Sequence, residues 1–318
     1  MSRIDAAAQR RHKLRNAAQA LLLLGGMFGM AGVAAFVLAG PVGVLWVAAA
    51  IAFVLLLRPK IPTAWVLRAY GAQRLPERVA PELHGLVGGL AARAGLPHPP
   101  HLYYVPTSML NAFAVGRRDD AAIGITDGLL RQLTGRELAG VLAHEISHIS
   151  NDDLWIMTLA DTVGRFTHAL AYVGLLLLLV GLPLLAAGSA AVLLVAVVLT
   201  AVPTVVTLLQ LALSRTREYD ADLEAARLTG DPVGLARALR TLEHHEGRIW
   251  ERILVPHRRS PDPLLLRTHP PTEERVRRLA ELVPLEEGRL VLRDVPLAPA
   301  GYTRVSSPTR LRPPGVWW

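Results

Sequence analysis

Cysteine is absent from this 318-residue chain, so the fold has neither disulfide bonds nor thiolate metal ligands. Any metal ion must therefore be held by histidine, aspartate or glutamate. Charge is also absent from two long stretches, because no Asp, Glu, Lys or Arg occurs from Ala17 to Leu57 or from Phe166 to Ser214. A membrane-spanning helix needs about 20 apolar residues. Each stretch is long enough for two such helices, which excludes an ordinary soluble domain.

Each uncharged stretch is predicted to form a hairpin of two transmembrane helices. Gly40-Pro41 interrupts the first stretch, and Gly188-Ser189 interrupts the second. The helix after Gly40-Pro41 would be only about 24 Å long, against an apolar bilayer core of about 30 Å. A re-entrant hairpin is therefore the alternative for that segment. The four predicted spans are Ala17–Ala39, Val42–Leu57, Ala169–Gly188 and Ala190–Leu213.

The formal net charge is +8, which in a soluble protein would suggest nucleic-acid binding. Here the basic residues flank the apolar stretches, a pattern that is typical of cytoplasmic segments of membrane proteins. We therefore expect a lipid bilayer as partner, no nucleic acid, and a location in the cell membrane. Both chain ends and both polar blocks are predicted to be cytoplasmic. The flanking basic residues are Arg10, Arg11, Lys13, Arg15, Arg58, Lys60, Arg165, Arg215 and Arg217.

The two polar blocks are together large enough for one hydrophobic core. In the first block, PELHGLVGGLAARAGL predicts an amphipathic helix, and HLYYVP and AAIGIT predict short strands with NAFAVG between them. The fold class is a mainly α membrane protein with an α+β domain and a small sheet. The predicted segments are a basic N-terminus (1–16), a first hairpin (17–57), a first part of the polar domain (58–165), a second hairpin (166–213), a second part of the polar domain (214–296) and a loose tail (297–318).

One helix of the first block carries a candidate metal site. The segment TGREL has Thr134 at the N-cap and Glu137 three residues later, which predicts a capping box and a helix start. His144 and His148 follow at positions i and i+4, so one helix face presents both imidazoles. Glu145 projects beside them, where it can act as a base toward metal-activated water. The alternative is a pair of surface or core histidines that share a face.

A third metal ligand is expected elsewhere in the chain, because catalytic zinc usually has three protein ligands. The segment SRTREYDAD follows directly on the last apolar span, so its helix should continue out of the membrane. Glu218 and Asp222 share a face of that helix. Glu218 could bind the metal, and Asp222 could accept a hydrogen bond from a ligand histidine. A solvated, charged helix end is the alternative.

The motifs HEISH (144–148) and EYDAD (218–222), placed between paired apolar stretches, resemble those of HtpX-like membrane zinc metallopeptidases. These are gluzincins related to the CAAX prenyl endopeptidases. The resemblance also covers NAFAVG, GLLRQLTGRELAGVLAHEISHISNDD and THPPTEERVRRL in that order, and extends from Ala17 to about Leu282. It implies one zinc ion per chain, held by His144, His148 and Glu218, with Glu145 as the catalytic base.

The resemblance has two further implications for the substrate. His269 is expected to lie near it, as a candidate hydrogen-bond donor to the developing oxyanion. Gluzincins commonly bind the substrate along an edge strand, and Ala121–Thr126 is predicted to be that strand.

The expected function is zinc-dependent cleavage of protein or peptide substrates, in particular misfolded membrane proteins, as part of membrane quality control. One alternative is a non-catalytic, zinc-dependent membrane scaffold, which would not need Glu145. Another is an intramembrane protease of the site-2 type, which the polar residues around the motif disfavour. CAAX-type processing is disfavoured by the chain length and by only four predicted spans. The polar residues are Arg136, Glu137, Asn151, Asp152 and Asp153.

Overall fold

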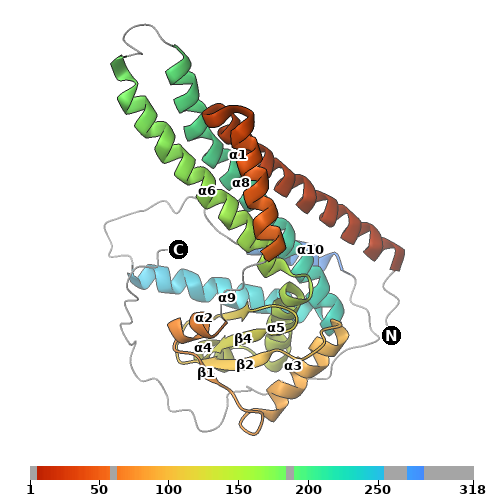
Figure 1. Ribbon diagram of the computed structural model, residues 1–318. Coiled ribbons are helices and arrows are strands. Elements are labelled where there is room, and N and C mark those ends of the chain that lie inside the picture. The colour runs from red at the N-terminus through yellow and green to blue at the C-terminus, as the bar shows by residue number, and fades with distance from the viewer. Residues whose placement is uncertain (1–5, 58–62, 184–189, 254–270, 283–318) are drawn as a thin grey trace.

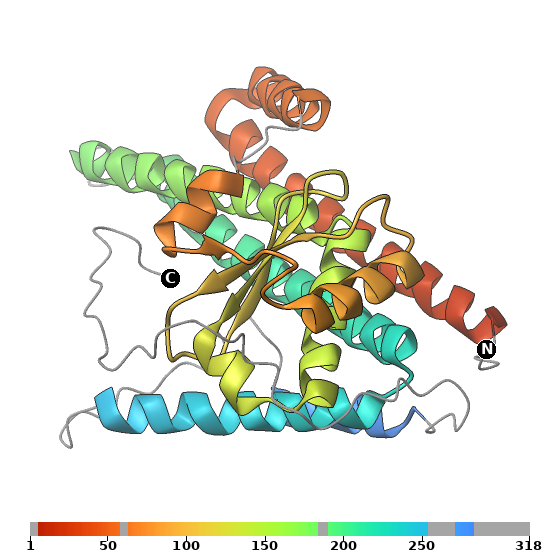
Figure 2. The ribbon, with the colours of Figure 1, turned by 90° about the horizontal axis from the view of Figure 1, so that it is seen from below.

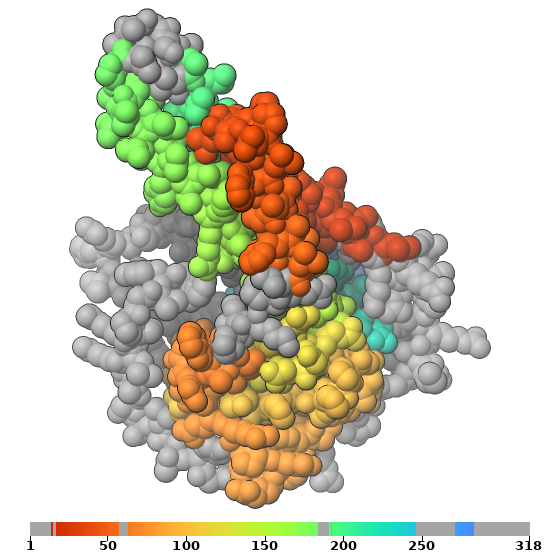
Figure 3. Space-filling model, viewed as in Figure 1, coloured from red at the N-terminus to blue at the C-terminus, as the bar shows by residue number. Residues whose placement is uncertain are grey.

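The computed structural model describes residues 6–57, 63–183, 190–253 and 271–282. A bundle of long helices projects from one end of a domain built around a small sheet (Figures 1 and 3). Three helices form the bundle: α1 (Ala6–Leu57), α6 (Asp153–Val180) and α8 (Ala190–Thr229). The domain contains α2 (Thr63–Ala69), α3 (Pro81–Arg93), α4 (Asp127–Gln132), α5 (Gly135–Ser150), α9 (Pro232–Ile253) and α10 (Thr272–Ala280).

Within the described residues, three helices are long and apolar enough to cross a membrane, namely Ala17–Leu56, Asp153–Val180 and Leu193–Thr229. The first is interrupted where the sequence predicts a break. Ala39 and Gly40 have non-helical backbone angles, and Gly40 has a φ of 61° and a ψ of −150°. Glycine adopts a positive φ without the steric cost of a Cβ. The chain changes direction at this point (Figure 1), and four spans remain a prediction.

Helix α6 begins earlier than the third predicted span, which started at Ala169. It starts at Asp153 and includes Asp161 and Arg165, which form an i,i+4 ion pair of 2.8 Å on its exposed side. The opposite side packs against α8, where a Cβ on Gly174 would lie 2.6 Å from Cβ of Leu199. Asp161 and Arg165 are therefore accommodated within the helix, because they face outward and neutralise each other.

Helix α8 runs without interruption from the apolar stretch into the polar segment. The predicted continuation of the last span into SRTREYDAD is therefore confirmed as one helix. Its upper part joins an apolar cluster shared with α1 and α6, in which Leu213 is buried. Its lower part joins a second cluster, in which Ala225 is buried among the residues of the domain. The polar segment around Glu218 thus lies between the two hydrophobic cores.

The sheet has four strands in the order β1-β2-β4-β3. Strand β4 pairs in parallel with β2 and antiparallel with β3, and β1 pairs antiparallel with β2. The predicted strands HLYYVP and AAIGIT are present, and NAFAVG supplies the third. The bounds are β1 Gln73–Arg74, β2 His101–Val105, β3 Ala112–Val115 and β4 Ala122–Thr126.

The prediction that Ala121–Thr126 forms the edge strand is wrong. Strand β4 (Ala122–Thr126) lies between β2 and β3, and all five of its residues are buried. The small residue Gly124 accommodates the Phe113 ring, since a Cβ there would lie 2.5 Å from that ring. Strand β3 (Ala112–Val115) is the outer strand on this side.

Helix α5 is fixed at its start and along its length. The capping box is present as predicted, because Thr134 accepts from the Glu137 backbone N–H and the Glu137 side chain accepts from the Thr134 N–H. Arg136 binds both oxygens of Asp231 at 2.7 and 2.9 Å, which joins the starts of α5 and α9. Asp231 directly precedes Pro232, the first residue of α9. Helix α9 lies along the domain beside α5, as the view from below shows (Figure 2).

Close packing of α5 on α9 depends on Gly140. A Cβ at this position would lie 2.9 Å from the Leu235 Cα, which is backbone and cannot rotate away. We expect Gly140→Ala to lower stability by about 1–3 kcal/mol because the site helix would be displaced. Gly85→Ala on α3 is the matched control, since nothing lies within 4 Å of its Cβ and alanine favours helix. Thermal unfolding in detergent should show a lower midpoint for Gly140→Ala alone, and equal midpoints would contradict this packing.

Candidate metal centre

Two histidines of α5 converge on one point. His144 and His148 are one helical turn apart, and their Nε2 atoms are 3.1 Å from each other. The rings are nearly perpendicular, with an interplanar angle of 88°. The i,i+4 spacing thus does what the sequence predicts and brings both imidazoles to the same side of the helix.

Glu218 of α8 completes this group. Its Oε2 lies 3.5 Å from Nε2 of His144, and its Oε1 lies 3.7 Å from Nε2 of His148. One possible ligand atom from each residue lies within 4.8 Å of the other two. The residues come from two helices, and His148 and Glu218 are separated by 70 positions in the sequence. His144, His148 and Glu218 could hold one metal ion.

The other nitrogen of each histidine is held by an aspartate. Nδ1 of His144 lies 3.0 Å from Asp222 Oδ1, and Nδ1 of His148 lies 2.9 Å from Asp153 Oδ2. A carboxylate at Nδ1 favours a proton on that nitrogen and leaves Nε2 with a lone pair. Both Nε2 lone pairs are then directed toward the same point as the Glu218 carboxylate.

This donor set fits zinc. Two imidazoles and a carboxylate are usual zinc ligands, with bonds of about 2.0–2.1 Å. In a tetrahedral site, atoms at that distance from the ion lie about 3.3 Å from one another. The separations of 3.1, 3.5 and 3.7 Å bracket this value. A cation between these atoms, either a metal ion or a proton, offsets the repulsion among the converging lone pairs and carboxylate oxygens.

Each of these aspartates also contacts a buried arginine. Arg275 of α10 donates to both oxygens of Asp222, at 2.6 and 2.7 Å, and its Nη1 lies 3.3 Å from Oε2 of Glu218. Arg217 of α8 donates from Nε to Oδ1 of Asp153 at 2.6 Å. Each histidine thus begins a chain of contacts that runs from imidazole to carboxylate to guanidinium.

The charges around His144 favour a cation. Burial lowers the pKa of His144, but hydrogen bonds to Asp222 and Glu218 outweigh it and raise the pKa to about 10. In the absence of metal the His144 imidazole would therefore carry a proton on both nitrogens and be positively charged at neutral pH. A metal ion binds the unprotonated nitrogen, so metal binding displaces that proton. Burial also lowers the pKa of Arg275, but the hydrogen bond and the charge of Asp222 outweigh burial and raise the pKa overall. The guanidinium therefore stays charged.

Glu145 lies beside the metal ligands and is fixed by the sheet. Its Oε2 accepts a hydrogen bond of 2.9 Å from the backbone N–H of Ala114 in β3. The side chain is half-buried, next to the buried His144 on the same helix. A carboxylate in this position can accept a proton from water held near the two Nε2 atoms.

The outer strand β3 directs backbone groups away from the sheet. The Asn111 carbonyl accepts from the Thr126 N–H at 3.1 Å, so this pair is hydrogen-bonded across the two strands. Hydrogen-bonded and non-hydrogen-bonded pairs alternate in antiparallel strands. Ala112 and Ala114 therefore turn their backbone groups away from β4, and the Ala114 N–H is the group that meets Glu145.

The structure brings together five of the six predicted site residues: His144, Glu145, His148, Glu218 and Asp222. His269 lies outside the described residues, which resume at Pro271, just before α10. Sequence reasoning missed Asp153, Arg217 and Arg275. For Asp153 and Arg217 the only signal is proximity to the motifs, since Asp153 follows His148 by five positions and Arg217 directly precedes Glu218.

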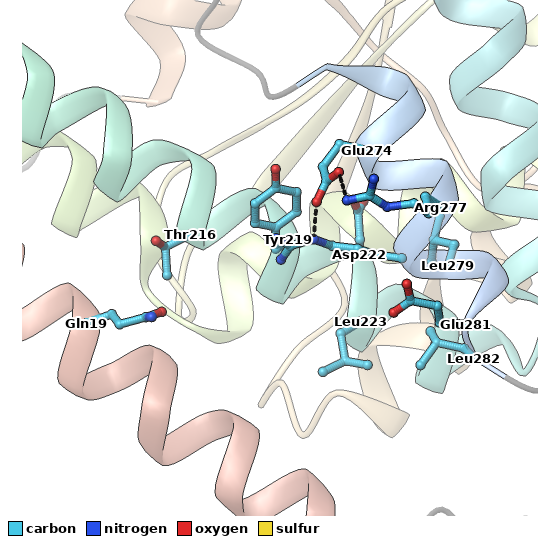
Figure 4. Close-up of a pocket in the computed structure, with 11 residues that line it drawn as sticks. Gln19, Thr216, Tyr219, Asp222, Leu223, Glu274, Arg277, Leu279, Glu281 and Leu282 are labelled. Atoms are coloured by element: carbon cyan, nitrogen blue, oxygen red, sulfur yellow. Dashed lines mark hydrogen bonds and ion pairs between the residues drawn. The ribbon is translucent and has the colours of Figure 1, made fainter.

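A cavity of about 810 Å³ lies between the start of α1, the lower part of α8 and α10 (Figure 4). Asp222 is part of its wall, so the cavity reaches the carboxylate that orients His144. The Arg278 guanidinium lies 3.6 Å from the centre of the Tyr219 ring. The lining residues are Gln19, Thr216, Tyr219, Asp222, Leu223, Glu274, Arg277, Arg278, Leu279, Glu281 and Leu282.

Comparison with known proteins agrees with this geometry. Residues 77–283 match the family model described as Peptidase family M48. A protease HtpX homolog from Persephonella marina is 36% identical over 281 residues, which cover 82% of this chain and 96% of the relative. A protease HtpX homolog from Pyrococcus abyssi is 38% identical over 265 residues, covering 75% and 87%.

A crystal structure of Ste24p from S. mikatae is 19% identical and has a TM-score of 0.49, covering 85% of this chain and 66% of that one. The family match includes both helices that carry the candidate metal ligands, and the similarity to the Persephonella relative extends over most of both chains. The chain belongs to peptidase family M48 and is an HtpX-like membrane metallopeptidase.

Proposed function

We propose that this chain is a zinc-dependent endopeptidase of the cell membrane, with its active site and both chain ends in the cytoplasm. The observation that carries the proposal is the convergence of His144, His148 and Glu218 beside Glu145, which is itself held by β3. The domain lies at one end of the long apolar helices, which supports cleavage beside the bilayer surface. Four transmembrane helices in two hairpins are part of this proposal.

The residues divide the chemistry between them. Zinc bound by such ligands lowers the pKa of water toward about 7 and polarises a carbonyl group. Glu145 accepts the proton of the attacking water at its carboxylate and returns it to the leaving amine. The Ala114 N–H keeps that carboxylate in one orientation throughout. Asp222 and Asp153 hold the two imidazoles, and His269 is proposed as a hydrogen-bond donor to the developing oxyanion.

The substrate is proposed to be an extended peptide segment that pairs with β3. The outward-facing backbone groups of Ala112 and the carbonyl of Ala114 can bind a peptide backbone as an added strand, while the Ala114 N–H stays bound to Glu145. Backbone pairing depends little on side chains, so a wide range of sequences would be accepted. This suits a role in the removal of misfolded membrane proteins, where the cleaved sequences vary.

The metal requirement tests this proposal directly. We expect the full chain, purified in detergent, to cleave an unfolded protein such as casein, to lose that activity with a zinc chelator and to regain it when zinc is returned. The reason is that every catalytic role above depends on an ion between His144, His148 and Glu218. A serine protease treated in parallel should be unaffected by the chelator. Cleavage that survives complete metal removal would contradict the proposal.

A further inference from the structure

Arg217 forms a buried contact that the catalytic scheme does not use. It is 9% exposed and binds Asp153, which is 2% exposed. Its Nε donates to Asp153 Oδ1 at 2.6 Å, Nη2 forms a second ion pair with the same oxygen, and Nη1 lies 3.2 Å from Asp220. Asp153 offers its other oxygen, Oδ2, to Nδ1 of His148. The two oxygens of one carboxylate therefore serve two different partners.

We propose that Arg217 is a positioning residue for the metal centre, acting on His148 through Asp153. Held from one side by the guanidinium, the Asp153 carboxylate can present Oδ2 to His148 in one orientation only. His148 then keeps Nε2 directed toward His144 and Glu218. This inference rests on the proposed role of these three residues as metal ligands.

Because the Arg217–Asp153 ion pair is buried, its loss would disturb the contact between Asp153 and His148. Removing one partner of a buried ion pair leaves an uncompensated charge, which is costly in a low-dielectric environment. Without Arg217, the Asp153 carboxylate would rotate or recruit water to recover a partner, and the His148 contact would loosen. Replacing a carboxylate that orients a metal-binding histidine typically lowers the metal affinity by about 10- to 100-fold.

The same contact ties the metal centre to the packing of two apolar helices. Asp153 is the first residue of α6, and Arg217 lies on α8 one position before Glu218. A displacement of α6 against α8 would therefore move the partner of His148 as well as the helix that carries Glu218. The orientation of the His148 ring therefore depends on how α6 and α8 pack against each other.

The test measures metal affinity rather than cleavage. Arg217→Gln removes the charge, Arg217→Lys keeps it, and Arg227→Gln is the control because Arg227 pairs with Glu224 on the same helix. Zinc affinity is measured by competition with a chromophoric chelator, and site geometry by the visible spectrum of the cobalt-loaded protein. For Arg217→Gln we expect the zinc affinity to fall by about 10-fold or more and the cobalt spectrum to change. Arg217→Lys should recover part of the affinity, and Arg227→Gln should give the parental affinity and spectrum.

A second arm tests whether Arg217 acts through Asp153. If it does, Arg217→Gln should weaken zinc binding far less in a chain that already carries Asp153→Asn. Additive losses, or parental zinc affinity and cobalt spectrum in folded Arg217→Gln, would overturn the proposal. Equal losses in Arg217→Gln and Arg227→Gln would also overturn it, because they would show a general effect on α8. A failure of peptide cleavage leaves these metal readouts intact, so the two proposals fail separately.

Discussion

Replacing Glu145 with glutamine is expected to abolish peptide cleavage while leaving the zinc content unchanged. Glutamine has the same shape, and its amide oxygen can still accept the hydrogen bond from the Ala114 N–H. It cannot accept a proton from water, however, and a positioned base contributes about 10²- to 10⁴-fold to the rate. The measurement is casein cleavage per chain alongside zinc content per chain by atomic absorption.

Glu137→Gln is the matched control for this prediction. Glu137 lies on the same helix in the capping box, where glutamine also functions, and it is remote from the metal ligands. Glu137→Gln should therefore cleave at the parental rate. Equal cleavage by the parent and Glu145→Gln would remove Glu145 as the base. A parent that binds zinc but never cleaves would favour the non-catalytic scaffold instead.

Replacing Glu218 with glutamine should have the opposite signature, since metal content and cleavage are expected to fall together. An amide oxygen is a poor zinc ligand, and two histidines alone leave the site one protein ligand short. Asp222 lies one turn further along α8, but Arg275 already binds both of its oxygens, so we do not expect it to replace Glu218 as a ligand. Zinc per chain after dialysis is the direct readout.

Glu224→Gln tests whether that loss is specific. Glu224 lies on the same helix, but it pairs with Arg227 rather than with a histidine. This variant should retain the parental zinc content. If Glu218→Gln also retains it, Glu218 is not a ligand.

The local features of the site could be predicted from the sequence. The HEISH spacing, the capping box at Thr134 and the helical continuation through Ser214 each depend on residues within one or two turns. The role of Asp153 could not be predicted in this way. Asp152 has a φ of 55° and interrupts the helical conformation between α5 and α6. The resulting turn brings Asp153 back to His148. A positive φ is uncommon outside glycine, so the sequence does not mark Asp152 as the position of this turn.

Features that depend on distant parts of the chain were the least predictable. Arg275 meets Asp222 across 53 positions, and nothing in the pattern of either segment specifies that contact. The edge strand was misassigned for the same reason, because strand order depends on non-local pairing. AAIGIT has the composition of a buried central strand, with alanine, glycine and isoleucine and no charge. Such a composition is typical of a strand that is buried on both faces of a sheet.

The continuous helix α8 sets an angular constraint on the length of the chain. It is about 60 Å long, and each residue advances the helix by about 100°. Leu199 is locked against Gly174 of α6, and Glu218 must face the two histidines. One residue inserted between these points would turn the Glu218 carboxylate to another side of the helix. The segment between Leu199 and Glu218 therefore has a fixed phase, and any adjustment to a thicker or thinner bilayer must occur beyond Leu199, at the far end of the helix pair.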